Sequence, residues 1–92
     1  MPTRTLVLNL ANGVTSSPMN VSGIRPFTVH AEGGYSVATV QIEQSMDHSG
    51  TEWKNLGSAV ADGATVTSDL GVAQIRAVAG GITGTADIYV VW

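Results

Sequence analysis

Few side chains in this chain could do chemistry, and their spacing does not match a known reaction. The two histidines, His30 and His48, have no partner in a metal-ligand spacing such as H-x-H or H-E-x-x-H. No G-x-S-x-G elbow is present, and Ser36 lies at the start of an expected strand. We therefore expect no catalytic residue, no cofactor and no bound metal, and we interpret both histidines as surface or turn residues.

Acidic residues near turns could hold calcium, as the loops of β-sandwiches often do through carboxylate and carbonyl oxygens. Asp47 and Glu52 flank one turn, and Asp62 and Asp69 flank another. Neither pair forms a dense D-x-D-x-D loop, and nothing places two acids ~5–9 Å apart in a cleft, as glycoside hydrolysis requires. We expect a protein that is not an enzyme. A structural cation at one of these turns is the alternative to the expectation that no metal is bound.

Composition narrows the choice of partners. The 92 residues make one domain, 1–92, in which residues 1–5 are a candidate N-terminal arm. The four basic residues are scattered and the net charge is −3, which argues against a nucleic-acid partner. Only 12% of residues are charged, about half the usual ~25%, and such a surface favours partial coverage by a protein partner.

Two further observations exclude classes of protein. No cysteine is present, which excludes disulfides, thiolate chemistry and cysteine-based zinc sites. The apolar run near the N-terminus is too short for a signal peptide, and no run of ~18 apolar residues predicts a membrane span.

Glycine and proline occur at short intervals, with runs rich in Val, Ile and Thr between them, which predicts short strands and no helix. Five runs alternate between apolar and polar residues, so that every second side chain faces a core. The residues predicted to face inward are Leu6, Leu8 and Leu10; Phe27, Val29 and Ala31; Ala38, Val40 and Ile42; Ala73, Ile75, Ala77 and Ala79; and Ala86, Ile88, Val90 and Trp92. With shorter strands expected near 19–21, 52–56 and 64–67, about eight strands predict an all-β fold. We expect a jelly-roll-like antiparallel β-sandwich, or a small barrel.

A faint internal repeat accompanies these strands. Residues 27–31 align with 75–79, and residues 38–42 align with 86–90, at an offset of 48. The paired glycines that follow the first strand of each half align at an offset of 47. We interpret the repeat as two equivalent hairpins in one sandwich; the alternative is that unrelated β-hairpins look alike.

The segment 45–53 interrupts two alternating runs with a polar turn and a tryptophan, and predicts a hairpin tip. Ser45, Asp47, Gly50 and Trp53 resemble the Asp-box of sialidases and related β-proteins, in which the carboxylate bonds backbone N–H groups and the tryptophan packs beneath the turn. A single copy of the motif excludes a propeller.

A longer set of motifs resembles small all-β virion proteins of tailed bacteriophages. These motifs are VSGIR at 21–25, the strand from Val40 through Ser45 to Trp53, LGS at 56–58, GVAQIR at 71–76 and GTADIYV at 84–90. The resemblance implies a capsid decoration (cement) protein that binds the head surface and stabilises the shell, or else a neck, tail or fibre component. It implies the major capsid protein or another virion protein as partner, a homo-oligomer (dimer or trimer), and a place in the virion, assembled in the host cytoplasm.

The candidate partner contacts are Arg4, Val7, Asp47, His48, Tyr89, Val91 and Trp92. They comprise the N-terminal arm, the hairpin tip and apolar side chains predicted to point away from the core. Trp92 is either a docking anchor, a common role of tryptophan at interfaces, or the residue that closes the end of this domain's own core. A carbohydrate-binding module is the alternative from another class, with Trp53, Tyr35 and Tyr89 as its sugar-stacking aromatics.

Overall fold

The computed structural model describes residues 2–36, 40–46, 52–68 and 72–92. These residues form eight strands, β1 (Thr3–Leu10), β2 (Met19–Asn20), β3 (Phe27–Glu32), β4 (Val40–Ser45), β5 (Lys54–Asn55), β6 (Thr65–Ser68), β7 (Gln74–Ala79) and β8 (Ala86–Val91). No helix long and apolar enough to cross a membrane occurs in the described part of the chain.

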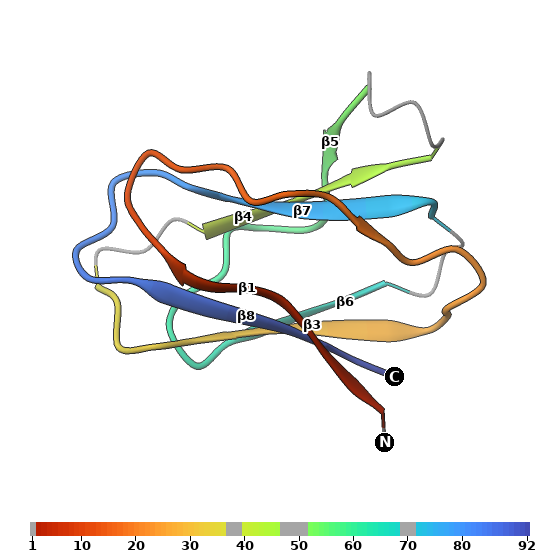
Figure 1. Ribbon diagram of the computed structural model, residues 1–92, viewed down its shortest axis with the longest axis horizontal. Helices are drawn as coiled ribbons and strands as arrows, with labels where there is room; N and C mark the ends of the chain where they lie inside the picture. The colour runs from red at the N-terminus through yellow and green to blue at the C-terminus, as the bar shows by residue number, and fades with distance from the viewer. Residues whose placement is uncertain (1, 37–39, 47–51, 69–71) are drawn as a thin grey trace.

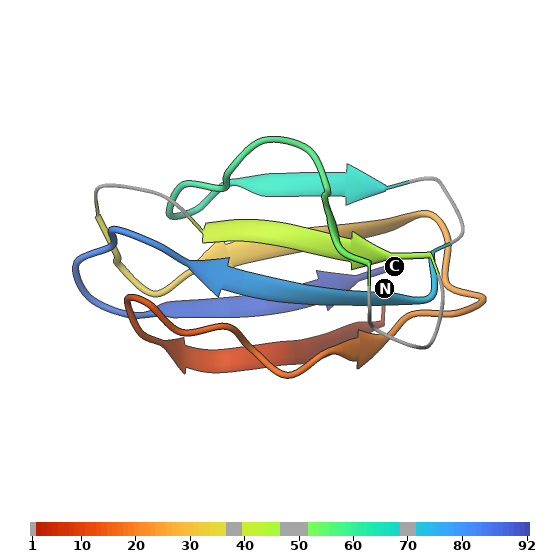
Figure 2. The same ribbon diagram turned by 90° about the horizontal axis from the view of Figure 1, so that it is seen from above.

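The strands form two four-stranded antiparallel sheets that pack face to face (Figure 1, and from above in Figure 2). Sheet A has the order β1-β8-β3-β6, and sheet B has the order β2-β7-β4-β5. The pairs β1–β8, β2–β7, β3–β6 and β4–β5 are nested, as in one long hairpin rolled into two layers. This arrangement is a jelly roll, and it confirms the predicted all-β sandwich of about eight strands.

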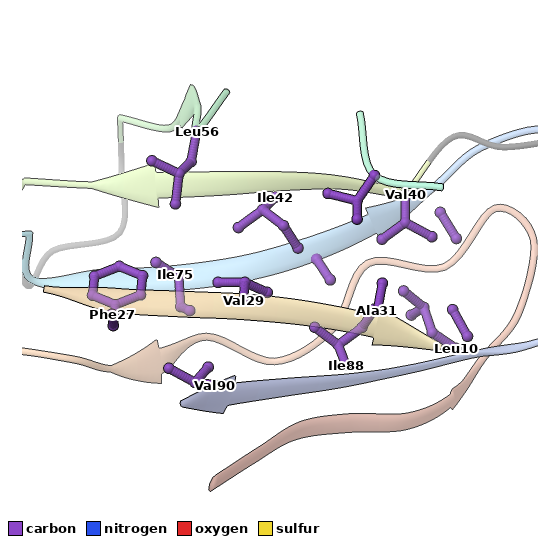
Figure 3. Close-up of a cluster of buried hydrophobic side chains, with 14 of the residues drawn as sticks. Leu10, Phe27, Val29, Ala31, Val40, Ile42, Leu56, Ile75, Ile88 and Val90 are labelled. Carbon is purple, nitrogen blue, oxygen red and sulfur yellow. The ribbon is translucent and has the colours of Figure 1, made fainter. Parts of the chain in front are cut away.

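The core lies between the two sheets and is made by the alternation that the sequence predicts. In β3, β7 and β8 every second residue is buried, and the intervening residues are half-buried or exposed. The buried apolar side chains labelled in Figure 3 are Leu10, Phe27, Val29, Ala31, Val40, Ile42, Leu56, Ile75, Ile88 and Val90. Ala38, also predicted to face inward, lies outside the described residues.

The alternation predicted for β1 is wrong in part. Leu8 is 55% exposed, although it was expected inside, and Val7 packs against the core, although it was expected outside. The pairing of β1 with β8 shifts register between Thr5 and Val7, and again between Val7 and Leu10. Each extra residue in β1 moves the following side chains to the other face. Asn9, within the second shift, has a left-handed φ of 56°, a conformation that asparagine tolerates.

The two repeated segments are not hairpins, because β3 and β8 lie in sheet A whereas β4 and β7 lie in sheet B. Each segment crosses from one sheet to the other and pairs with its counterpart. Val29 pairs with Val90. The residue 48 positions after Val29 is Ala77, the residue 48 positions before Val90 is Ile42, and these two residues also pair with each other. The same correspondence relates Thr28–Val91 to Arg76–Glu43, His30–Tyr89 to Val78–Gln41, and Ala31–Ile88 to Ala79–Val40. The repeat therefore extends to the register of the strands.

A turn that follows β1 has a counterpart after β5. Asn12 Oδ1 accepts hydrogen bonds from the backbone N–H groups of Gly81 (2.6 Å) and Ile82 (3.2 Å). At the equivalent place, Asp62 Oδ1 accepts one from Gly34 N–H (3.0 Å). In both cases, a side chain from one of the two stretches 2–46 and 52–92 thus fixes the glycine turn of the other.

The first residues are not a separate arm in this structure. Thr3, Arg4 and Thr5 pair with β8 as the first part of β1. Trp92 N–H donates to the carbonyl oxygen of Pro2 at 3.1 Å, so the two ends of the chain lie side by side (Figure 1).

Candidate functional site

The residues whose side chains could take part in catalysis or metal binding do not gather in one place. His30 lies on the outer face of β3, with its Nε2 3.2 Å from Glu32 Oε2 in a partly exposed pair. His48 lies outside the described residues. Within the part of the chain that the structure describes, no three His, Asp or Glu side chains are placed to hold a metal ion.

Two of the carboxylates hold backbone groups in place. Asp62 bonds the glycine turn described above, and Asp87 accepts a hydrogen bond from the N–H of Asn9 at 2.9 Å. The hydrogen bond from Asn9 to Asp87 stabilises the left-handed backbone conformation of Asn9, where the register of β1 is irregular. Asp47 and Asp69 fall outside the described residues.

The outer face of sheet B carries one cluster that the sequence did not reveal. Arg76 Nε donates to Glu43 Oε1 at 2.7 Å, and the Arg76 guanidinium lies 4.2 Å from the centroid of the Trp53 ring. Trp53 is half-buried, with its ring against the Arg76 guanidinium. The equivalent residues in sheet A, Thr28 and Val91, are uncharged. Only the register of β4 with β7 brings the charges together, so no sequence motif could have marked the cluster.

The three aromatics considered for sugar stacking do not share a surface. Tyr35 is buried and its hydroxyl donates to the carbonyl oxygen of Val60 at 2.6 Å. Burial, with a smaller contribution from the charge of Asp62, raises the pKa of Tyr35 to about 12. Trp53 lies beside sheet B, whereas Tyr89 lies on the outer face of sheet A. These positions do not form the flat platform that a carbohydrate-binding module requires.

Five of the seven predicted contact residues come together on the ladder of β1 with β8. Arg4 and Val7 lie on β1, Tyr89 and Val91 lie on β8, and Trp92 follows directly. Arg4 is exposed, and Tyr89 and Val91 are half-buried on the outward side of β8. Val7 and Trp92 instead pack against the core, which favours Trp92 as a residue that closes the end of the sandwich.

The other two predicted contacts, Asp47 and His48, lie outside the described residues. The flanking strands do form the expected hairpin, because Gln44 pairs with Lys54 across β4 and β5.

We call the exposed part of this ladder the β1–β8 surface. It consists of the exposed Thr3, Thr5 and Leu8 and the half-buried Tyr89 and Val91, together with Arg4, which is exposed but pairs with the inward-facing Val90. β1 is an edge strand of sheet A, so its side away from β8 has no strand partner within the described residues. Unpaired N–H and C=O groups along an edge strand can hydrogen-bond an added strand. The surface thus offers a strand edge with an apolar side chain, Leu8, beside it.

No family model matches the chain, and no match was found among curated proteins or solved structures.

Proposed function

We propose that this protein is a structural component of a bacteriophage virion, a decoration protein that binds the head surface through the β1–β8 surface and stabilises the shell. The motif resemblance to small phage virion proteins supports the class. The jelly roll supports it at the level of fold, because viral capsid domains use this architecture. The observation that carries the docking site is the open eight-residue edge strand β1, which gathers predicted contact residues along one ladder.

The chemistry of the surface defines its partner. The open edge of β1 offers backbone hydrogen bonds to an extended segment, as in β-strand addition. Leu8 presents an exposed apolar side chain, and Arg4 forms no ion pair with any described residue. We therefore expect a capsid-protein segment that runs beside β1 and carries an apolar side chain for Leu8 and an acid for Arg4.

A binding assay tests this function. Heads assembled without this protein, from the phage that encodes it, are mixed with the purified chain and sedimented. The wild-type chain should co-sediment, and Leu8→Asp should weaken binding by at least about tenfold, since a buried apolar contact of ~1.4 kcal/mol corresponds to that factor. Arg4→Glu should weaken binding as well, and its effect should shrink at high salt because screening reduces an exposed charge contact.

Two matched control variants test where on this chain the contact with the head lies. Val14→Asp makes the same kind of change at another exposed apolar side chain, outside the β1–β8 surface, and should leave binding unchanged. Met46→Asp tests the hairpin tip; a loss there, with none for Leu8→Asp, would move the contact to the tip. A wild-type chain that does not bind heads would contradict the decoration role, and binding to purified tails instead would favour the neck, tail or fibre alternative.

A further inference from the structure

The strand pairs that the structure describes all join two stretches of the chain. We call residues 2–46 the first half and residues 52–92 the second half. The described pairings, β1–β8, β2–β7, β3–β6, β3–β8, β4–β5 and β4–β7, each join a strand of the first half to a strand of the second. In Figure 1, strands of the first half, coloured red through yellow-green, accordingly alternate with strands of the second half, coloured green through blue.

Contacts outside the strands follow the same division. The isolated bridge Ser36–Thr83 joins the halves, as does the hydrogen bond from Gly63 N–H to Ala31 O (2.8 Å). The described backbone bonds within one half close tight turns, as between Val14 N–H and the carbonyl oxygen three residues earlier. Neither half therefore contains a described strand pair of its own, and each depends on the other for its sheets.

We propose that two copies of this chain exchange their second halves and form an intertwined dimer. Each sandwich of this dimer consists of the first half of one copy and the second half of the other. The proposal concerns self-association of the fold and does not depend on the function proposed above. The partner is a second copy of this chain, because it alone supplies every strand register that the first half requires.

Exchange preserves nearly all interactions, because all the ladders between halves re-form with the second copy. The change is confined to the connection between Gln44 and Lys54, the last described pair of β4 and β5. Within one chain, that short connection holds the two halves at an effective concentration of about 1 mM. Exchange should therefore compete with the monomer when the chain refolds near that concentration.

A pair of introduced cysteines can report which copy supplies each half. Thr28 Oγ1 of the first half lies 3.0 Å from Thr67 Oγ1 of the second, so these side chains point at each other across β3 and β6. The chain has no cysteine of its own. In the variant Thr28→Cys with Thr67→Cys, the disulfide lies within one chain in the monomer, and it joins two chains in the exchanged dimer.

The reduced variant is unfolded, refolded by dilution to about 10 µM or about 1 mM, oxidised and run on a denaturing gel without reductant. We expect a monomer band at the lower concentration and roughly half of the chains in a dimer band at the higher one. A variant oxidised before unfolding should give monomer only, because its halves are tied together. Thr28→Cys alone should give no dimer that depends on refolding concentration. A monomer band under both conditions, or a native dimer that runs as monomer on the gel, would overturn the proposal.

A shortened chain provides a second test. Deletion of residues 46–53, combined with the same cysteine pair, leaves Ser45 alone between Gln44 and Lys54. A hairpin requires at least two connecting residues, so this chain cannot pair β4 with its own β5 in the native register. We expect a disulfide-linked dimer at every concentration, whereas a folded monomer would contradict the proposal. If the shortened chain does not fold, the full-length refolding experiment decides alone.

Discussion

Ser36 and Thr83 donate backbone hydrogen bonds to each other's carbonyl oxygens, at 2.9 Å and 3.0 Å. Each residue holds the same place in its half, two positions after a Gly-Gly pair. When the two halves are interchanged, Ser36 takes the place of Thr83 and Thr83 that of Ser36, so the pair is its own equivalent. The pairs between β3 and β8 have their equivalents in the pairs between β4 and β7.

The matching turn contacts should have matching energies. Asn12→Ala and Asp62→Ala should each lower the free energy of unfolding by about 1 kcal/mol, because each removes the acceptor of a backbone N–H in the opposite half. Asn12→Asp should be tolerated, since the other half uses aspartate at that place. Urea denaturation measures these effects, with Ser58→Ala at an exposed position as the control. Equal stabilities for Asn12→Ala and the control would contradict the role given to this contact.

The register shifts in β1 predict opposite behaviour for two nearby leucines. Leu10 is 2% exposed and Leu8 is 55% exposed. Leu10→Ala should therefore destabilise the fold by about 3 kcal/mol through lost burial and a cavity, whereas Leu8→Ala should change stability by less than about 0.5 kcal/mol. Thermal unfolding of the two variants checks this. Similar losses for both would mean that β1 alternates regularly, without the shifts.

Gly33 is a described glycine at which an added Cβ would clash with main chain. Its φ is +122°, and a Cβ built there would lie 2.7 Å from the backbone oxygen of Thr85. Gly33→Ala should cost about 3 kcal/mol, since it combines backbone strain with a clash against main chain. Gly23 is the matched control, with a φ of +79° and open space around it; Gly23→Ala should cost only about 1 kcal/mol of strain. Denaturant midpoints distinguish the two, and the reverse order would contradict this geometry.

Stability should fall at high pH because of Tyr35. Its pKa is raised by burial from 10.0 to about 12, so the unfolded chain loses this proton first. The contribution of Tyr35 is fully present below pH 10 and is lost as the pH rises through 12, by roughly 2 kcal/mol at most. Urea denaturation from pH 8 to pH 12 should show this loss.

Tyr35→Phe is the control for that titration. It should be less stable at neutral pH by about 1 kcal/mol, because it leaves the carbonyl oxygen of Val60 without the hydroxyl donor. It should also have a flatter pH dependence between 10 and 12 than the wild type. Parallel curves for the two proteins would assign the alkaline loss to other groups.

The fold could be predicted from sequence wherever one face of a strand is buried. In β3 and β8 each buried residue is followed by a more exposed one, so a period of two identifies the strand and its inward face. In β1 a bulge adds a residue without changing composition, so the alternation in the sequence no longer gives the inward face beyond that point. The repeat resembles two hairpins in the sequence, because a local pattern cannot tell a turn within a sheet from a crossing between sheets.

The candidate surface was predicted in part. Tyr89 and Val91 could be assigned to an outer face by parity alone, and the structure places Thr3 and Thr5 beside them on β1, whereas Arg4 pairs with the inward-facing Val90. Val7 and Trp92 were harder to assign, since their contact with the core depends on register and on the end of the sandwich. The Arg76–Glu43 pair could not be predicted, because its members are far apart in the sequence.

The sequence by itself determined the chemical character of this protein: strands with one apolar face, few charges and no cysteine. These properties are local, because they depend on residue type and on neighbours one or two positions away. The tertiary structure alone decided which strands pair, that every described pair joins the two halves, and that β1 is left as an open edge. Those features arise from contacts between residues distant in the chain, where geometry and not local pattern selects the partner.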